Sequence, residues 1–156
     1  DRWLDDFPNL VVTRTFSKAY GLAGLRVGYA LSHPDVANLL NRVRQAFNVN
    51  TMALAAATAA LKDFEFINNS RLLNEQGLEQ LYAGLDTLGL EYVRSRGNFV
   101  LADVGRPGGE VYEALLRRGI IVRPVGGYGL PNHLRITVGK TAQNDLLLDA
   151  LEQAIS

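Results

Sequence analysis

Lys18 stands in a set of residues that could together perform covalent chemistry on a phosphorylated aldehyde. Thr15 and Ser17 precede it, Arg26 follows eight residues later, and the window also contains Gly21, Gly24 and Gly28. A lysine amine that loses its proton can condense with an aldehyde. Short hydroxyls, backbone N–H groups and a planar guanidinium are the groups that bind a phosphate. The window is therefore the layout expected around a lysine that holds pyridoxal phosphate.

The neighbours of Lys18 distinguish it from an ordinary surface lysine. Apolar residues on both sides, among them Phe16, Tyr20 and Leu22, predict a partly desolvated amine, which favours the neutral, nucleophilic form. Arg26 lies in an apolar stretch, where an unpaired guanidinium is costly, so we expect it to meet a phosphate or, alternatively, an acid in a structural salt bridge. Thr15 and Ser17 could equally satisfy the backbone of a turn.

Composition excludes several other functions. The chain has 156 residues with 16 basic and 16 acidic side chains, so it has no net positive charge that would attract nucleic acid or an anionic membrane. With no cysteine there are no disulfides and no thiolate metal sites, and two histidines do not make a metal site. No apolar run reaches the roughly 20 residues that span a bilayer. We expect a cytoplasmic protein without nucleic acid, membrane or metal partners.

The pattern of apolar residues predicts an α/β protein in three parts. Strands are expected at 10–12 and 28–31, followed by helices from Pro34 to Phe47 and from 52 to 61. Residues 64–88 fit one long amphipathic helix that could link two domains. Beyond it, strands at 98–104, 119–123 and 134–138 alternate with helices at 110–118 and 141–155, the latter capped by Thr141. The expected parts are therefore the end of a large domain (1–50), linking helices (51–88) and a small α/β domain (89–156).

The window and two later segments resemble the fold-type-I pyridoxal-phosphate aminotransferases of classes I and II, and within them the histidinol-phosphate aminotransferases. The segments are Gln45 to Asn50 before the alanine-rich helix, Gly119 to Pro124, and His133 to Gly139. The resemblance covers essentially the whole chain and implies its fold: the C-terminal portion of such an enzyme, with the end of the large domain, a linking helix and the small domain.

The resemblance also implies a role for each matching residue. Lys18 matches the catalytic lysine that bonds to the cofactor, and Thr15, Ser17 and Arg26 match the groups that bind the cofactor's phosphate. Arg135 matches the arginine that binds the substrate's α-carboxylate, with Arg123 and Asn98 also beside the substrate. Because Arg135 lies in an otherwise apolar strand, a buried structural ion pair is the alternative for it. The implied reaction converts histidinol phosphate and 2-oxoglutarate to imidazole acetol phosphate and glutamate, a step of histidine biosynthesis, in a homodimer.

Three alternatives stay open. A related enzyme acting on aromatic amino acids or on threonine phosphate would share the lysine window. A module that binds pyridoxal phosphate as a sensor, or a structural fragment, would not depend on turnover. Because full-length relatives carry a carboxylate, a stacking aromatic and a tyrosine upstream of the lysine, none of which can be placed here, we expect the isolated chain to bind the cofactor weakly and to be inactive.

Overall fold

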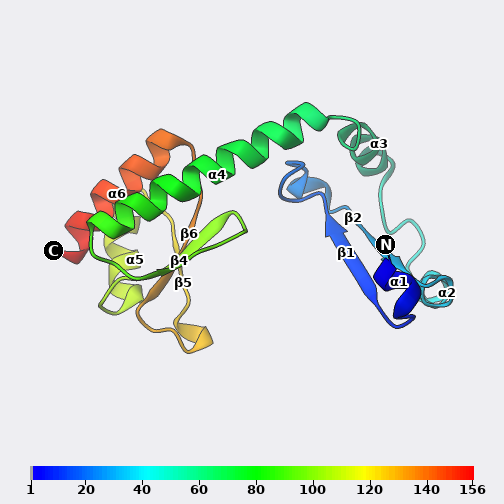
Figure 1. The fold of residues 1–156 in the computed structure, drawn as a ribbon, viewed down its shortest axis with the longest axis horizontal. Coiled ribbons are helices and arrows are strands. Elements are labelled where there is room, and N and C mark those ends of the chain that lie inside the picture. Colours follow the sequence, from blue (N-terminus) through cyan, green and yellow to red (C-terminus); the bar gives the residue numbers. More distant parts are fainter. Residues whose placement is uncertain (1) are drawn as a thin grey trace. The chain divides into compact units, whose positions relative to one another are not determined.

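The computed structural model describes residues 2–156 and divides into two compact units. The N-terminal unit ends at Ser70, and the C-terminal unit runs from Arg71 to Ser156. One long helix, α4 (Phe64–Thr87), contains the division, and its bounds agree with the helix expected at 64–88. Figure 1 shows the order of the elements along the chain. Among the described residues, no helix is both long and apolar enough to cross a membrane.

The N-terminal unit is built around a two-stranded antiparallel sheet. Strand β1 (Val11–Thr15) pairs with β2 (Gly28–Ser32) so that Thr15 lies opposite Gly28. The lysine window connects the two strands and contains a single turn of 3₁₀ helix, η1 (Ala23–Leu25). Helices α1 (Arg2–Asp6), α2 (Pro34–Val43) and α3 (Thr51–Ala60) complete the unit.

Two of these helices begin where capping residues predict. Pro34 starts α2, and the His33 ring accepts a hydrogen bond from the Asp35 N–H at 3.3 Å. The Asn50 side chain accepts one from the Ala53 N–H at 2.8 Å and so begins α3. The end of α2 differs from the expectation, because the helix stops at Val43, and Phe47 takes a left-handed φ of 55° and is exposed.

The C-terminal unit is a four-stranded antiparallel sheet in the order β3-β4-β6-β5, with helices packed on one face. The strands are β3 (Tyr92–Val93), β4 (Phe99–Asp103), β5 (Arg123–Pro124) and β6 (His133–Thr137). Alternate residues of β4 and β6 are buried and form one core with apolar residues of α4, of α5 (Gly108–Leu116) and of α6 (Thr141–Ile155). The other face of the sheet carries the charged side chains discussed below.

The strand expected at 119–123 is reduced to Arg123 and Pro124. Gly119 ends α5 with a left-handed φ of 79°, as the sequence predicts, but the Ile120 N–H still bonds back to the Leu115 carbonyl at 3.0 Å. Residues 119 and 120 therefore form the end of the helix, at the positions where the expected strand would begin its pairing with a neighbouring strand. Thr141 is also not the cap of α6: Lys140 holds that position, and its N–H bonds to the Gln143 side chain at 2.9 Å.

The two glycines inside α4 allow close helix packing. A Cβ at Gly77 would collide with the Val138 side chain, and one at Gly84 would collide with Leu148 of α6. Both glycines therefore cost helix propensity and in return let the backbone of α4 approach its neighbours.

Candidate functional site

Two buried residues hold the ends of the lysine window together. Phe16 and Val27 are both buried and belong to one small core with Ala53 and Ala57 of α3. The Phe16 N–H also donates to the Val27 carbonyl at 3.2 Å. Ser17 directly follows one of these residues and Arg26 directly precedes the other, so the tie places the hydroxyl and the guanidinium side by side.

Three of the four residues predicted to bind the cofactor are brought together by this tie. Arg26 Nη1 lies 3.4 Å from Ser17 Oγ and donates to the Ala23 carbonyl at 2.8 Å. The Ser17 N–H donates to Thr15 Oγ1 at 3.0 Å. Thr15 therefore satisfies a backbone group of the turn and also lies next to Ser17, the residue that Arg26 contacts. The result is a short cluster of two hydroxyls and one positive charge.

Arg26 is charged, strained and without a carboxylate partner. Its φ of 52° is left-handed, a conformation that costs a non-glycine residue about 1 kcal/mol or more. Among residues 2–156 it forms no ion pair, so the structural salt bridge left open by the sequence is absent from the described part of the chain. An exposed guanidinium in a strained turn beside two hydroxyls is suited to binding an anion.

Lys18 differs from its expected surroundings. Its side chain is exposed, and the partial desolvation predicted from its apolar neighbours is wrong for this chain. The reason is that those neighbours pack elsewhere: Phe16 is buried, and Tyr20 and Leu22 pack against the Phe16 core. The turn itself is well defined, since the Gly21 N–H bonds to the Lys18 carbonyl at 2.8 Å and Gly21 takes a φ of 69°.

The C-terminal unit brings together the two arginines that the sequence singled out. Arg123 of β5 and Arg135 of β6 are direct cross-strand partners, and Leu101 of β4 is the partner of Arg135 on its other side. Direct partners in an antiparallel pair point to the same face of the sheet. The two positive side chains therefore share the face opposite the helices, and no described acid forms an ion pair with either.

Arg135 is fixed in place but not hydrogen-bonded at its inner nitrogen. Its guanidinium carbon lies 5.1 Å from the centre of the Phe99 ring, which holds the flat group by a cation–π contact. Its Nε atom is buried and has no hydrogen-bond partner among the residues that the structure describes. The buried ion pair that the sequence left as an alternative is thus not formed within residues 2–156.

Asn98 lies one residue before β4, and its backbone continues the pairing of β4 with β6. Its carbonyl accepts a hydrogen bond from the Val138 N–H at 2.9 Å, while its side chain is exposed. Its backbone is therefore fixed and its amide is available to a ligand. The Lys18 cluster belongs to the N-terminal unit, and the arginine pair and Asn98 belong to the C-terminal unit.

Sequence reasoning missed two features of the C-terminal unit. His133 Nε2 lies 3.9 Å from Asp103 Oδ2, and its buried Nδ1 has no partner. A groove of about 460 Å³ lies between α4 and the segment from Arg94 to Arg96, and none of the predicted site residues lines it. Both depend on pairing between distant segments, which leaves no signal in local spacing. No group of three or more His, Cys, Asp or Glu side chains within 2–156 is arranged to hold a metal ion.

Comparison with known proteins agrees with these observations. Residues 2–151 match the family described as aminotransferase class I and II, and the chain belongs to that family. It is 58% identical over 154 residues to histidinol-phosphate aminotransferase 2 of Pseudomonas fluorescens (strain Pf0-1), covering 99% of this chain and 42% of that protein. The chain thus spans about two fifths of the length of this relative.

Solved structures extend the likeness to the fold. The crystal structure of histidinol-phosphate aminotransferase from Sinorhizobium meliloti, in complex with pyridoxal-5'-phosphate, has a TM-score of 0.88 at 35% identity, covering 96% of this chain and 42% of that one. L-threonine-O-3-phosphate decarboxylase from Porphyromonas gingivalis has a TM-score of 0.84 at 27% identity, over 97% and 48% of the two chains. The α/β fold expected from the sequence, that of fold-type-I aminotransferases, is confirmed; the placement as a C-terminal portion stays a prediction.

Proposed function

We propose that this chain is part of a pyridoxal-phosphate-dependent aminotransferase that transfers an amino group from histidinol phosphate to 2-oxoglutarate. The observation that carries the proposal is that Arg26, Arg123 and Arg135 form no ion pair within residues 2–156, although a hydroxyl and a carbonyl orient Arg26, the Phe99 ring orients Arg135, and Arg123 lies directly opposite Arg135. Charges held in this way are suited to anionic ligands. The 58% identity to a histidinol-phosphate aminotransferase supports the choice of substrate.

The residues around Lys18 fit the cofactor's phosphate. Arg26 Nη1, Ser17 Oγ and Thr15 Oγ1 supply a charge and two hydroxyls in one cluster, next to an accessible amine. When bound, pyridoxal phosphate supplies an electron sink for the negative charge that develops at the substrate's Cα. Lys18 directly follows Ser17 of this cluster. Its Nζ would take the proton from that Cα and return one, acting as general base and then as general acid.

The residues on the open face of the C-terminal sheet would bind the substrate. Arg135, held flat by Phe99, presents a guanidinium to the α-carboxylate of glutamate or 2-oxoglutarate. Arg123 stands opposite it and doubles the positive charge. Because histidinol phosphate has no carboxylate, the same arginines would also accept its phosphate. Asn98, with its exposed side chain just before β4, would orient the bound substrate.

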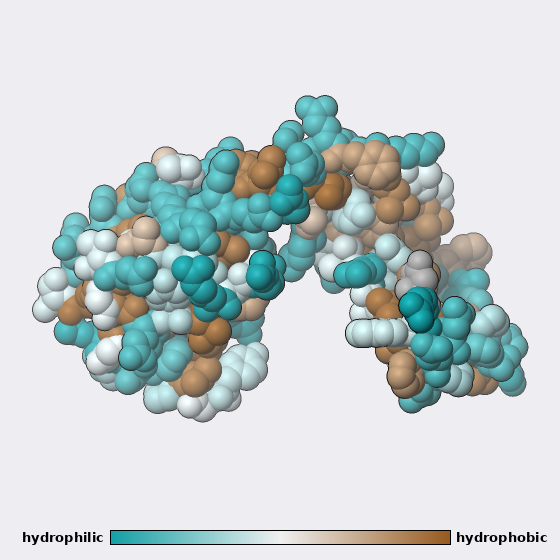
Figure 2. Space-filling view, viewed as in Figure 1, coloured by the Kyte–Doolittle hydropathy of each residue, from teal (hydrophilic) through white to brown (hydrophobic). Residues whose placement is uncertain are grey.

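A homodimer and a cytoplasmic location belong to the same proposal. Large apolar side chains of the N-terminal unit are strongly exposed, among them Phe47 at 97% and Val43 at 80%. Figure 2 shows such hydrophobic side chains at the surface of this unit. Exposed apolar surface of this kind is covered in an assembled protein by further chain or by a second copy. The absence of cysteine is compatible with a reducing cytosol.

A threonine-phosphate decarboxylase is the second candidate, favoured by the TM-score of 0.84 to such an enzyme. Its substrate carries both a carboxylate and a phosphate, each of which a guanidinium can bind, so the arginine pair suits either reaction. Steady-state rates of the intact protein with histidinol phosphate, phenylalanine and threonine phosphate separate the candidates. A protein that binds the cofactor but turns over none of the three is instead a sensor.

The decisive experiment is covalent trapping in the intact protein. Borohydride reduction of the protein incubated with pyridoxal phosphate should fix the cofactor on Lys18, identified by peptide mass spectrometry. Lys18→Ala should abolish both the trapped adduct and activity, whereas Lys62→Ala, which removes another exposed lysine of the same unit, should leave both intact. A cofactor trapped at any other lysine would refute the assignment of Lys18.

A further inference from the structure

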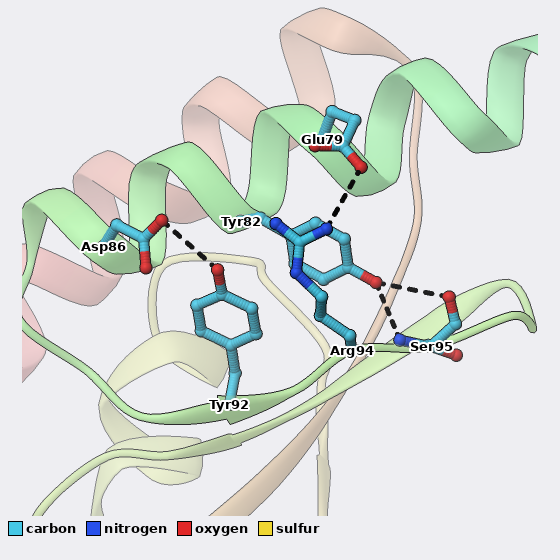
Figure 3. Close-up of polar contacts among 6 residues, drawn as sticks. All are labelled: Glu79, Tyr82, Asp86, Tyr92, Arg94 and Ser95. Atoms are coloured by element: carbon cyan, nitrogen blue, oxygen red, sulfur yellow. Dashed lines mark hydrogen bonds and ion pairs between the residues drawn. The ribbon is translucent and has the colours of Figure 1, made fainter.

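The segment that carries Asn98 is held by one tyrosine of α4. Tyr82 is buried, and its hydroxyl contacts both backbone groups of Ser95: it accepts a hydrogen bond from the Ser95 N–H at 2.7 Å and donates one to the Ser95 carbonyl at 3.3 Å. A single side chain thus satisfies a donor and an acceptor of the chain only three residues before Asn98. Figure 3 shows this hydroxyl pointing at Ser95.

The hydrogen bonds continue from Ser95 to the substrate-facing residues. Ser95 Oγ accepts a hydrogen bond from the Gly97 N–H at 3.0 Å, and the Gly97 carbonyl accepts one from the Asn74 side chain at 3.0 Å. The next carbonyl, that of Asn98, is bonded to Val138. Every residue from 97 to 99 is therefore tied to a neighbour, and the run ends at the Phe99 ring that lies against Arg135.

The ring of Tyr82 is itself immobilised on two sides. The Tyr92 ring stacks on it with centroids 4.9 Å apart and planes 8° apart, and the Arg94 guanidinium lies 4.8 Å from its centroid. Arg94 is in turn 3.8 Å from Glu79. Figure 3 shows Arg94 over Tyr82 and the Tyr92 hydroxyl directed at Asp86. A hydroxyl held this firmly can set the position of the backbone that it contacts.

From these contacts we propose that Tyr82 is a positioning residue for the carboxylate-binding face: its hydroxyl sets the backbone of residues 95–98, and through it the placement of Asn98 and of the Phe99 ring that orients Arg135. The proposal rests on the proposed function, because it assumes that Arg135 and Asn98 bind the substrate. Tyr82 touches no ligand in this scheme and acts only through the segment it holds.

Removing one hydroxyl tests the proposal, and the chain offers a matched control. Tyr82→Phe keeps the ring stack and loses both bonds to Ser95, while Tyr92→Phe loses a hydroxyl of the same stack that bonds to the exposed Asp86. In the intact protein, we expect Tyr82→Phe to raise the KM for 2-oxoglutarate and the Kd for maleate, an unreactive dicarboxylate, by about fivefold. Because Tyr92→Phe leaves the segment in place, both constants should stay within about twofold of wild type.

A second measurement separates positioning from general damage. Hydrogen exchange at the Ser95 and Gly97 amides should accelerate in Tyr82→Phe and not in Tyr92→Phe, while the absorbance of bound cofactor is unchanged. A Tyr82→Phe protein with wild-type maleate affinity overturns the positioning role, as does one in which both variants weaken maleate equally. A wild-type protein that neither binds maleate nor transaminates instead overturns the proposed function.

Discussion

Replacing Arg123 with glutamine should stabilise the protein and weaken its binding of dicarboxylates at the same time. Arg123 and Arg135 are direct cross-strand partners of like charge, and no described acid is paired with either. Like charges opposite one another on a sheet cost about 0.2–1 kcal/mol. Because Arg123 is exposed and screened by solvent, the gain from removing its charge should lie near 0.2–0.5 kcal/mol.

The loss in binding should be larger than this gain. A hydrogen bond to a charged group contributes about 1.5–3 kcal/mol, and the exposure of Arg123 places its contribution at the lower end, or about tenfold in Kd. Urea denaturation of the intact protein measures the stability, and titration calorimetry with maleate measures the affinity. Arg118→Gln, which removes an exposed arginine that follows α5 and bonds to the Ala114 carbonyl, should leave the Kd for maleate unchanged.

A residue whose replacement raises the stability of the protein and lowers its affinity for a ligand is one that is kept for binding rather than for folding. If Arg123→Gln lowers stability, the two guanidinium groups do not repel one another as the register implies. If the Kd for maleate stays at the wild-type value, Arg123 takes no part in binding the anion. The first result refutes repulsion between the two arginines, and the second refutes the pair as a shared carboxylate site.

Three further outcomes are expected. Gly77→Ala should destabilise the protein by about 1 kcal/mol in urea denaturation, because collision with Val138 costs about 1–3 kcal/mol and outweighs the gain of about 1 kcal/mol in helix propensity. Asn144→Ala should cost about 3 kcal/mol, since this buried amide makes three hydrogen bonds of about 1 kcal/mol each. Desolvation, and then the Asp86 carboxylate, raises the pKa of Tyr92 above its usual 10.0, so the folded state favours the neutral phenol. The stability that Tyr92 contributes should therefore be complete below pH 10.0 and fall as pH rises beyond it, and its phenolate absorbance should appear at lower pH in Asp86→Asn.

Local patterns predicted the parts of this fold that depend on local forces. His33 with Pro34, Asn50 and Gly119 marked helix ends correctly, because capping involves atoms only a few residues apart. The exposure of Lys18 was not predictable in this way, since it depends on its apolar neighbours packing against α3, more than 30 residues further along.

In the candidate site too, local features were predictable from the sequence, and features that depend on distant segments were not. The residues of the lysine window were identified by their types and spacing, and the structure adds how Phe16 and Val27 hold them. The opposition of Arg123 and Arg135 required the register between β5 and β6, which spacing does not give. The hold of Tyr82 on Ser95 joins a helix to a loop through one hydroxyl, and a buried tyrosine in sequence looks like any other core residue.

The bond from Phe16 to Val27 has a consequence for redesign. Because both ends of the intervening stretch are anchored in the interior, Gly24, where a Cβ would meet no atom within 4 Å, can be exchanged for a larger residue without displacing Ser17 or Arg26. Variation in this stretch can then alter what surrounds Lys18 while leaving the corner formed by Thr15, Ser17 and Arg26 as it is. Libraries built between the two anchors offer a route to new substrates on the same scaffold.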